Sequence, residues 1–394
     1  MSRGRFKSNY PQFVRHEVTV LPTPQRVGAL PQFQGDGIVI AYIDSGFSRH
    51  ADIEGRVIVH ADAGTHHIVE TPHVVDISPL SWHGHMTTVI GSGDGRSSNG
   101  LFTSIAPKSK LVLVKVSTPD GRIKEPDILR GLRWIYETRN RYKVRIVNVS
   151  VGGDFVTEDP HNPLFQMVRK LHTVGIVVVI SAGNANAEYM VPPASAPHAV
   201  TVGGYDDQNT LDETQWKLFH HNYSRTYNGL IKPELLAPAA WIASPLLPDS
   251  ATANEIEWLG KVLETDTETQ LLDILKDGWK PLGLQKSDTQ AVSDELITTL
   301  QARLYHHKVI NSHYQHVDGT SVATPIVSSV VAQMLQVNPN LQPDDVKFIL
   351  QDTAKLLADV PIHKQGAGRL NARDAVLAAQ TYTPDLHHPQ ESSA

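Results

Sequence analysis

Five predominantly apolar runs recur between residues 38 and 202 of the chain. They occupy residues 38–43, 111–116, 144–149, 176–180 and 199–202. A short run without polar alternation is typical of a strand that is buried on both faces of a sheet. Between these runs, apolar residues return every three or four positions over 127–138 and 162–174, which predicts helices. Strands that alternate with helices predict an α/β fold, with a mostly parallel sheet and helices on both of its faces.

The pattern changes between residues 245 and 317. Two helical segments, 267–276 and 290–307, follow each other there without a strand between them, and Thr267 and Gln270 have the spacing of a capping box. This region therefore looks like a helical block that is inserted into the α/β body. Helical patterns resume afterwards, at 321–336 and 343–357.

These patterns predict four parts of the chain. Four prolines interrupt the first 34 residues, which we interpret as an extended arm that packs on the surface or covers a cleft. The other predicted parts are an α/β body formed by 35–244 and 318–380, the helical insertion at 245–317 and a flexible tail at 381–394.

Composition excludes several classes of protein. The chain has 394 residues, of which 40% are hydrophobic, so it can bury a large core. Its 35 Lys and Arg against 41 Asp and Glu give a net charge of −6, which argues against a nucleic-acid partner. No apolar run is long enough to span a bilayer, so we expect no membrane partner. The absence of cysteine excludes disulfides and thiolate nucleophiles. With an N-terminal region that lacks a signal-like apolar segment, it predicts a cytoplasmic location.

Polar side chains of complementary chemistry stand at the ends of the predicted elements. Asp44 follows the first apolar run, residues 150–153 follow the third, and Asn184 follows the fourth, while His83 and Ser321 stand near the starts of helical segments. Ligands of parallel sheets bind at the carboxyl ends of the strands. A hydroxyl, an imidazole, a carboxylate and an amide are the groups that acyl transfer requires. Each of them alone has an ordinary structural explanation, as a turn or a helix cap, so the hypothesis depends on the combination.

Five stretches of the sequence resemble the subtilisin-like serine proteases (subtilases). They are IVIAYIDSG around Asp44, WHGHMTTVIGSG around His83, VNVSVGG at 147–153, SAGN at 181–184 and GTSVATP around Ser321. The resemblance covers about residues 35–244 and 318–380, in the order that the family has. It implies a subtilisin-like fold and a serine endopeptidase, with Ser321 as nucleophile, His83 as general base, Asp44 as its orienting carboxylate and Asn184 as oxyanion donor.

The resemblance also has implications for ligands. It implies that Ser150, Val151, Gly152 and Gly153 form an extended edge that pairs with the backbone of a peptide or protein substrate. It implies no required cofactor, although calcium is common in the family. The loop at 93–100 contains Asp94 and Asn99, too little for a set of calcium ligands, and calcium stays open. His313 and His316 are spaced like metal ligands but lack a third, so we predict no metal site.

Two departures from the family pattern leave alternatives open. The sequence reads His83-Gly84-His85 where the family has His-Gly-Thr, so His85 competes with His83 as the base. The insertion at 245–317 is either a surface decoration or a lid on which a protein partner docks. Rival functions are a narrow-specificity processing protease that acts on one partner protein, and a catalytically silent pseudoprotease that binds peptides.

Overall fold

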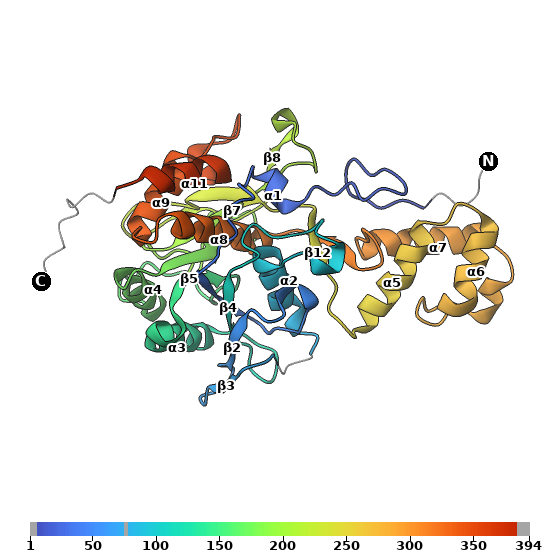
Figure 1. Cartoon of the computed structure of the whole chain (residues 1–394), viewed down its shortest axis with the longest axis horizontal. Helices are drawn as coiled ribbons and strands as arrows, with labels where there is room; N and C mark the ends of the chain where they lie inside the picture. Colours follow the sequence, from blue (N-terminus) through green and yellow to red (C-terminus); the bar gives the residue numbers. More distant parts are fainter. Residues whose placement is uncertain (1–5, 75–77, 384–394) are drawn as a thin grey trace, which may run out of the picture.

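The computed structural model describes residues 6–74 and 78–383 of the chain (Figure 1). Its main sheet contains the strands β1 (Val39–Asp44), β2 (Val57–Asp62), β3 (Val69–Thr71), β4 (Lys110–Lys115), β5 (Val144–Val149), β6 (Val177–Ser181), β7 (Val200–Asp206), β8 (Lys217–Leu218) and β11 (Leu235–Pro238). Two two-stranded antiparallel sheets stand apart from it, β9 (Ser224–Arg225) with β10 (Ile231–Lys232) and β12 (Ile242–Pro245) with β13 (Tyr314–Val317).

The strand order confirms the predicted mostly parallel sheet. It is β11-β7-β6-β5-β1-β4-β2-β3, with β8 beside β7. Among these nine strands, the only antiparallel pairs are β2 with β3 and β7 with β8. The five apolar runs of the sequence correspond to β1, β4, β5, β6 and β7.

Helices cover both faces of this sheet, as the sequence predicted. The helices of the body are α1 (Thr23–Arg26), α2 (Ser81–Ser92), α3 (Glu125–Tyr142), α4 (Pro163–Thr173), α8 (Thr320–Val337), α9 (Pro343–Asp352), α10 (Ile362–Gln365) and α11 (Ala372–Thr381). Alternate side chains of β1 point to opposite faces. Ile40 and Tyr42 share a core with α2, α8 and α11, whereas Ala41 and Ile43 share another with α3 and α4. Both faces of β1 are therefore apolar.

The helix α8 is the central helix of the first face. By length and composition it could cross a membrane, but 83% of that apolar stretch is buried inside the protein. It packs against α2, α11 and the strands β5, β6, β7 and β11. Its apolar character is therefore explained by its place in the core.

The insertion contains three helices within the described residues, where the sequence predicted two. They are α5 (Ala251–Leu263), α6 (Glu268–Gly278) and α7 (Asp294–His306), and they pack around a core of their own at one end of the molecule (Figure 1). The prediction missed α5, which contains Gly260. A side chain there would stand 2.3 Å from the backbone nitrogen of Ser312, so glycine allows the close contact. The predicted capping box is present, since Thr267 and Gln270 exchange hydrogen bonds.

The arm connects the insertion to the body. The Phe6 side chain is 2% exposed and lies in the core of the inserted helices. Further along, Asn209 donates its amide hydrogens to the backbone oxygens of Pro11 and Thr19, and Arg26 forms a buried ion pair with Asp207. The described part of the arm is largely without regular structure, as expected, apart from α1.

One predicted helix limit was wrong. The helix α9 ends at Asp352, not at 357, because Lys355 pairs with Arg369 instead. The helix α2 begins at Ser81, so His83 lies in its first turn. Residues 384–394 of the predicted tail lie outside the described residues, and the limits of the four predicted parts stay predictions.

Candidate active site

The carboxyl end of β1 presents a buried carboxylate to the first turn of α2. Asp44 is fully buried, and its Oδ1 lies 2.7 Å from Nδ1 of His83. The same carboxylate accepts the backbone N–H of Ser45 at 2.7 Å and the hydroxyl of Thr87 at 3.1 Å. With Nδ1 held in this way, the imidazole keeps one tautomer and one orientation, and Nε2 is the ring nitrogen left for chemistry.

The charge of Asp44 sets the proton affinity of His83. Burial by itself lowers the pKa of this histidine, but the attraction of the Asp44 carboxylate and the hydrogen bond to it outweigh burial and raise the pKa above its ordinary value. The pair therefore stabilises an imidazolium, the form that a general base adopts once it has taken a proton.

The competing histidine lies in a different environment. His85 is a fully buried residue of α2, and its ring packs edge-on against His50 with 5.0 Å between the ring centres. Burial and the neighbouring His50 lower the pKa of His85 to about 3. Neither ring nitrogen makes a hydrogen bond of normal geometry within the described residues. His83, and not His85, is thus the histidine in contact with Asp44.

The first turn of α8 brings Ser321 beside Asn184. The Asn184 carbonyl oxygen accepts the backbone N–H of Thr320 at 2.9 Å and its hydroxyl at 3.0 Å. A side chain at Gly319 would stand 3.3 Å from the Ser321 hydroxyl oxygen and 3.4 Å from the Asn184 amide nitrogen. The amide nitrogen and the hydroxyl therefore border the same small space, and the amide can donate into it.

Packing between α2 and α8 brings the two pairs to the same side of the sheet. The Ser329 hydroxyl of α8 donates to the backbone oxygen of Gly91 in α2. Near the start of α2, a side chain at Gly84 would stand 2.1 Å from the backbone oxygen of Gly46, so only glycine allows this approach. Within the described residues, no hydrogen bond joins Ser321 to His83 directly. Such bonds are often long in unbound enzymes and shorten when a substrate binds.

The segment Ser150–Gly153 continues from β5 and is anchored next to Ser321. The Ser150 hydroxyl donates to the backbone oxygen of Ser321 at 3.3 Å, and the N–H of Gly153 donates to the Pro192 oxygen at 2.7 Å. In the described residues, Val151 and Gly152 make no backbone hydrogen bond outside the segment. Gly152 is exposed. The middle of the segment is therefore an open backbone edge.

The sequence analysis did not single out Thr87 and Thr320, the two residues that hold this arrangement in place. Thr320 orients the amide of Asn184, and Thr87 binds the second oxygen of Asp44. Both stand inside the quoted motifs, one directly before Ser321 and one four residues after His83. Their position in those motifs was the available signal, but which atoms they contact depends on packing between distant segments.

Metal ligands do not gather around the candidate positions. No group of three or more His, Asp or Glu side chains within residues 6–74 and 78–383 could hold a metal ion. His316 is buried and contacts Asn9 at 2.8 Å, whereas His313 is exposed. In the 93–100 loop, the Asp94 carboxylate binds the guanidinium of Arg96 at 3.0 Å, and a guanidinium there disfavours a cation.

Comparison with known proteins identifies similar sequences. The model of the subtilase family matches residues 35–369. The serine protease AprX of Bacillus subtilis is 29% identical over 353 residues, which cover 87% of this chain and 66% of AprX. Subtilisin BL of Lederbergia lenta is 29% identical over 175 residues, 44% of this chain and 58% of that protein. The chain thus spans somewhat less than two thirds of the length of these relatives.

Solved structures share the fold. Fervidolysin of Fervidobacterium pennivorans, a keratinolytic enzyme related to subtilisin, superposes with a TM-score of 0.61 at 18% identity, over 91% of this chain and 45% of that chain. A protease of Pseudoalteromonas arctica superposes with a TM-score of 0.59 at 20% identity, over 92% of this chain and 94% of that chain. At such identities the likeness concerns the fold alone.

Proposed function

Since the chain belongs to the subtilase family, we propose that it is a serine endopeptidase that acts on peptide or protein substrates. One observation carries the proposal. The buried Asp44 carboxylate holds His83 at 2.7 Å, while Thr320 turns the Asn184 amide toward the space beside the Ser321 hydroxyl. A base with its orienting carboxylate, and a nucleophile with an oxyanion donor, are the two pairs that acyl transfer needs.

Acylation proceeds by transfer of one proton through His83. The Ser321 hydroxyl oxygen attacks the carbonyl carbon of the scissile bond while Nε2 of His83 takes its proton. The carbonyl oxygen becomes an oxyanion, to which the Asn184 amide and the Ser321 backbone N–H donate. The carbon–nitrogen bond then breaks, the imidazolium gives its proton to the leaving amine, and an ester to Ser321 remains.

Deacylation repeats these steps with water as the nucleophile. His83 takes a proton from water, the hydroxide attacks the ester carbon, and the same two donors bind the oxyanion. The bond to the Ser321 oxygen breaks, and the proton on His83 returns to that oxygen. Asp44 stays ionised throughout and stabilises the imidazolium in both halves of the reaction.

The open edge of Ser150–Gly153 fits the part of the substrate that precedes the scissile bond. Val151 and Gly152 offer unpaired backbone groups to an extended peptide, which would add to them like a strand. A side chain at Gly153 would stand 2.6 Å from a carboxylate oxygen of Glu125, so glycine keeps this edge in place beside α3. Main-chain pairing of this kind aligns the carbonyl carbon with Ser321.

A fluorophosphonate probe tests the proposal against a silent pseudoprotease. The probe forms a covalent bond only with an activated serine, so we expect labelling of the full chain that Ser321→Ala abolishes. Ser293→Ala is the matched control, because Ser293 also stands at a helix start but accepts the N–H of Leu296 as a cap. Absence of labelling in a folded, intact sample would favour the silent binding protein.

A narrow-specificity processing protease is the second candidate function. The insertion carries its own core and stands at one end of the molecule, where a protein partner docking on 245–317 would be held near the site. Cleavage of a peptide library separates the two candidates. A broad profile favours a general endopeptidase, and cleavage confined to one motif favours the processing protease.

We propose further that the reaction needs no cofactor. The proton transfers and oxyanion contacts described above use only Asp44, His83, Asn184 and Ser321 of this chain. Dialysis against EDTA should leave the rate unchanged, and restoration of a lost rate by added Ca²⁺ would contradict this and indicate a calcium requirement.

A cytoplasmic location is the last part of the proposal. It is supported by the complete absence of cysteine from 394 residues, because secreted proteins often carry disulfides and cytoplasmic ones rarely do. Fractionation of the source cells with an antibody against the chain tests it, and recovery from the medium would contradict it.

A further inference from the structure

A cavity of about 640 Å³ lies beside the candidate catalytic pair and is partly built by the insertion. One wall is Trp82, whose ring centre is 6.4 Å from that of His83. Much of the remaining lining comes from the connector, which we define as residues 246–253 and which leads from β12 into α5. Gln315 of β13 and the turn before α2 complete the lining. The cavity therefore lies directly beside His83, the residue that follows Trp82 in the chain.

The lining of this cavity is mostly apolar. Pro79 and Trp82 contribute from the body, and Leu246, Leu247, Pro248 and Ala251 contribute from the connector. Burial of a leucine or phenylalanine side chain between such groups is favourable by the hydrophobic effect. A cavity of this size and composition fits one or two large apolar side chains.

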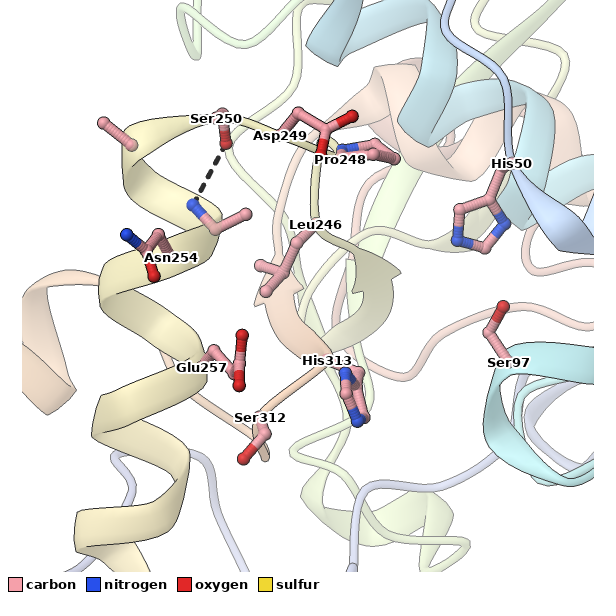
Figure 2. A pocket seen from close by; sticks show the side chains of 12 residues that line it. His50, Ser97, Leu246, Pro248, Asp249, Ser250, Asn254, Glu257, Ser312 and His313 are labelled. Carbon is pink, nitrogen blue, oxygen red and sulfur yellow. Dashed lines mark hydrogen bonds between the residues drawn. The ribbon is translucent and has the colours of Figure 1, made fainter. Parts of the chain in front are cut away.

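A second cavity lies on the other side of the connector. Its volume is about 720 Å³. Figure 2 shows this space between α5 and the body, with Glu257 and His313 facing His50 and Ser97 across it. Its lining is more polar than that of the cavity at Trp82. An apolar side chain that reaches the connector is therefore better accommodated on the Trp82 side.

Burial and hydrogen bonds hold the connector in place. Leu247 is 7% exposed, and the Ser250 hydroxyl donates to its backbone oxygen at 2.8 Å. The same hydroxyl accepts the N–H of Ala253 at 3.0 Å and so caps α5 (Figure 2). Since both ends of the connector are held in this way, the cavity is preformed and a ligand does not have to order it.

The chemistry of the proposed reaction says which part of a substrate comes here. The acyl half lies along the Ser150–Gly153 edge, and His83 gives its proton to the leaving amine, so the leaving segment must pass His83. The cavity adjoins His83 through Trp82, and none of its lining residues belongs to the edge that holds the acyl half. We propose that this cavity, the leaving-side pocket, binds a large apolar side chain in the substrate segment that follows the scissile bond. This inference rests on the proposed function.

Matched peptides test the pocket with the full chain. Internally quenched peptides identical up to the scissile bond carry either leucine or glycine at the first three positions after it. We expect kcat/KM for the leucine peptide to exceed that for the glycine peptide by about tenfold or more, because an apolar group bound in a hydrophobic pocket usually raises kcat/KM by at least this factor. Ala251→Trp, at an exposed wall position, fills the pocket and should bring the ratio close to one.

Thr269→Trp is the matched control. Thr269 is exposed on α6 and lines neither cavity, so its substitution adds the same side chain to the insertion elsewhere and should keep the ratio. Thermal unfolding checks that each variant is folded, and Thr252→Trp, at a second exposed wall position, replaces Ala251→Trp if that variant is not.

The outcomes separate the pocket from the reaction. A peptidyl p-nitroanilide has no residue after the scissile bond, so its hydrolysis tests the proposed function alone. Hydrolysis of the anilide together with a leucine-to-glycine ratio near one overturns the pocket but not the protease. A high ratio that survives in folded Ala251→Trp and Thr252→Trp also overturns it. Absence of anilide hydrolysis would overturn the proposed function, and the pocket with it.

Discussion

Replacement of Asp44 by asparagine tests the effect of the negative charge that lies next to His83. Asparagine has nearly the same shape, so the packing around β1 is kept while the negative charge is removed. In the proposed reaction, this charge stabilises the imidazolium that forms when His83 takes the proton of Ser321. The amide can also accept from or donate to Nδ1, so it no longer selects one tautomer.

The size of the effect follows from the geometry. The carboxylate oxygen lies 2.7 Å from the ring nitrogen, and Asp44 is fully buried. Two unit charges about 4 Å apart attract each other by about 4 kcal/mol at the effective dielectric constant of a protein. Each 1.4 kcal/mol, roughly, changes a rate tenfold. We therefore expect Asp44→Asn to lower kcat/KM about 1,000-fold.

The pH dependence of the rate provides a second, independent readout. His83 acts as a base, so the rate rises with pH as its imidazolium loses the proton, and the raised pKa puts this rise above the ordinary pH for histidine, about 6.5. In Asp44→Asn the raising contributions are lost and the lowering by burial remains. The rise should therefore move to lower pH in the variant.

The assay is kcat/KM for a peptidyl p-nitroanilide between pH 5 and pH 9, roughly, for the parent chain and each variant. Asp344→Asn is the control, because Asp344 contacts His172 at 2.9 Å in a pair of the same kind on the surface. It should keep both the rate and the profile. A loss of less than about tenfold in Asp44→Asn, or an unmoved profile, would refute the proposed role of the charge.

Three further substitutions test other parts of the molecule. Asn184→Ala should lower kcat about 100-fold or more at an unchanged KM, as expected for a lost oxyanion donor; a change confined to KM speaks against that role. Phe6→Ala should lower the free energy of unfolding by about 3–5 kcal/mol in urea titrations, while the exposed Val14→Ala changes little, and equal effects would contradict the anchoring of the arm. Gly84→Ala should displace α2 from Asp44 and reduce hydrolysis severely, because the new methyl group would stand 2.1 Å from the backbone oxygen of Gly46. Normal activity would contradict the requirement for glycine at this position.

Much of the body could be predicted from the order of residue types alone. Strands such as β1 lie where an apolar run is too short for a helix and lacks alternation, because both faces of this sheet are buried. The capping box at Thr267 and Gln270 was equally visible, since both partners stand within one helical turn. By contrast, the need for glycine at position 260 of α5 could not be predicted, because its reason is a contact with Ser312, far along the chain.

For the candidate site, the sequence alone determined the kinds of group and their places at element ends, together with the family that such motifs resemble. Only the tertiary structure showed which of His83 and His85 contacts Asp44. The two stand two residues apart on the same helix, but His83 contacts Asp44 and His85 contacts His50. The tertiary structure also decided that Asn184 turns its amide to Ser321 and that the arm enters the core of the insertion. The physical reason is range: propensity, periodicity and caps depend on neighbours in the chain, whereas charge, burial and cavities depend on segments that only folding brings together.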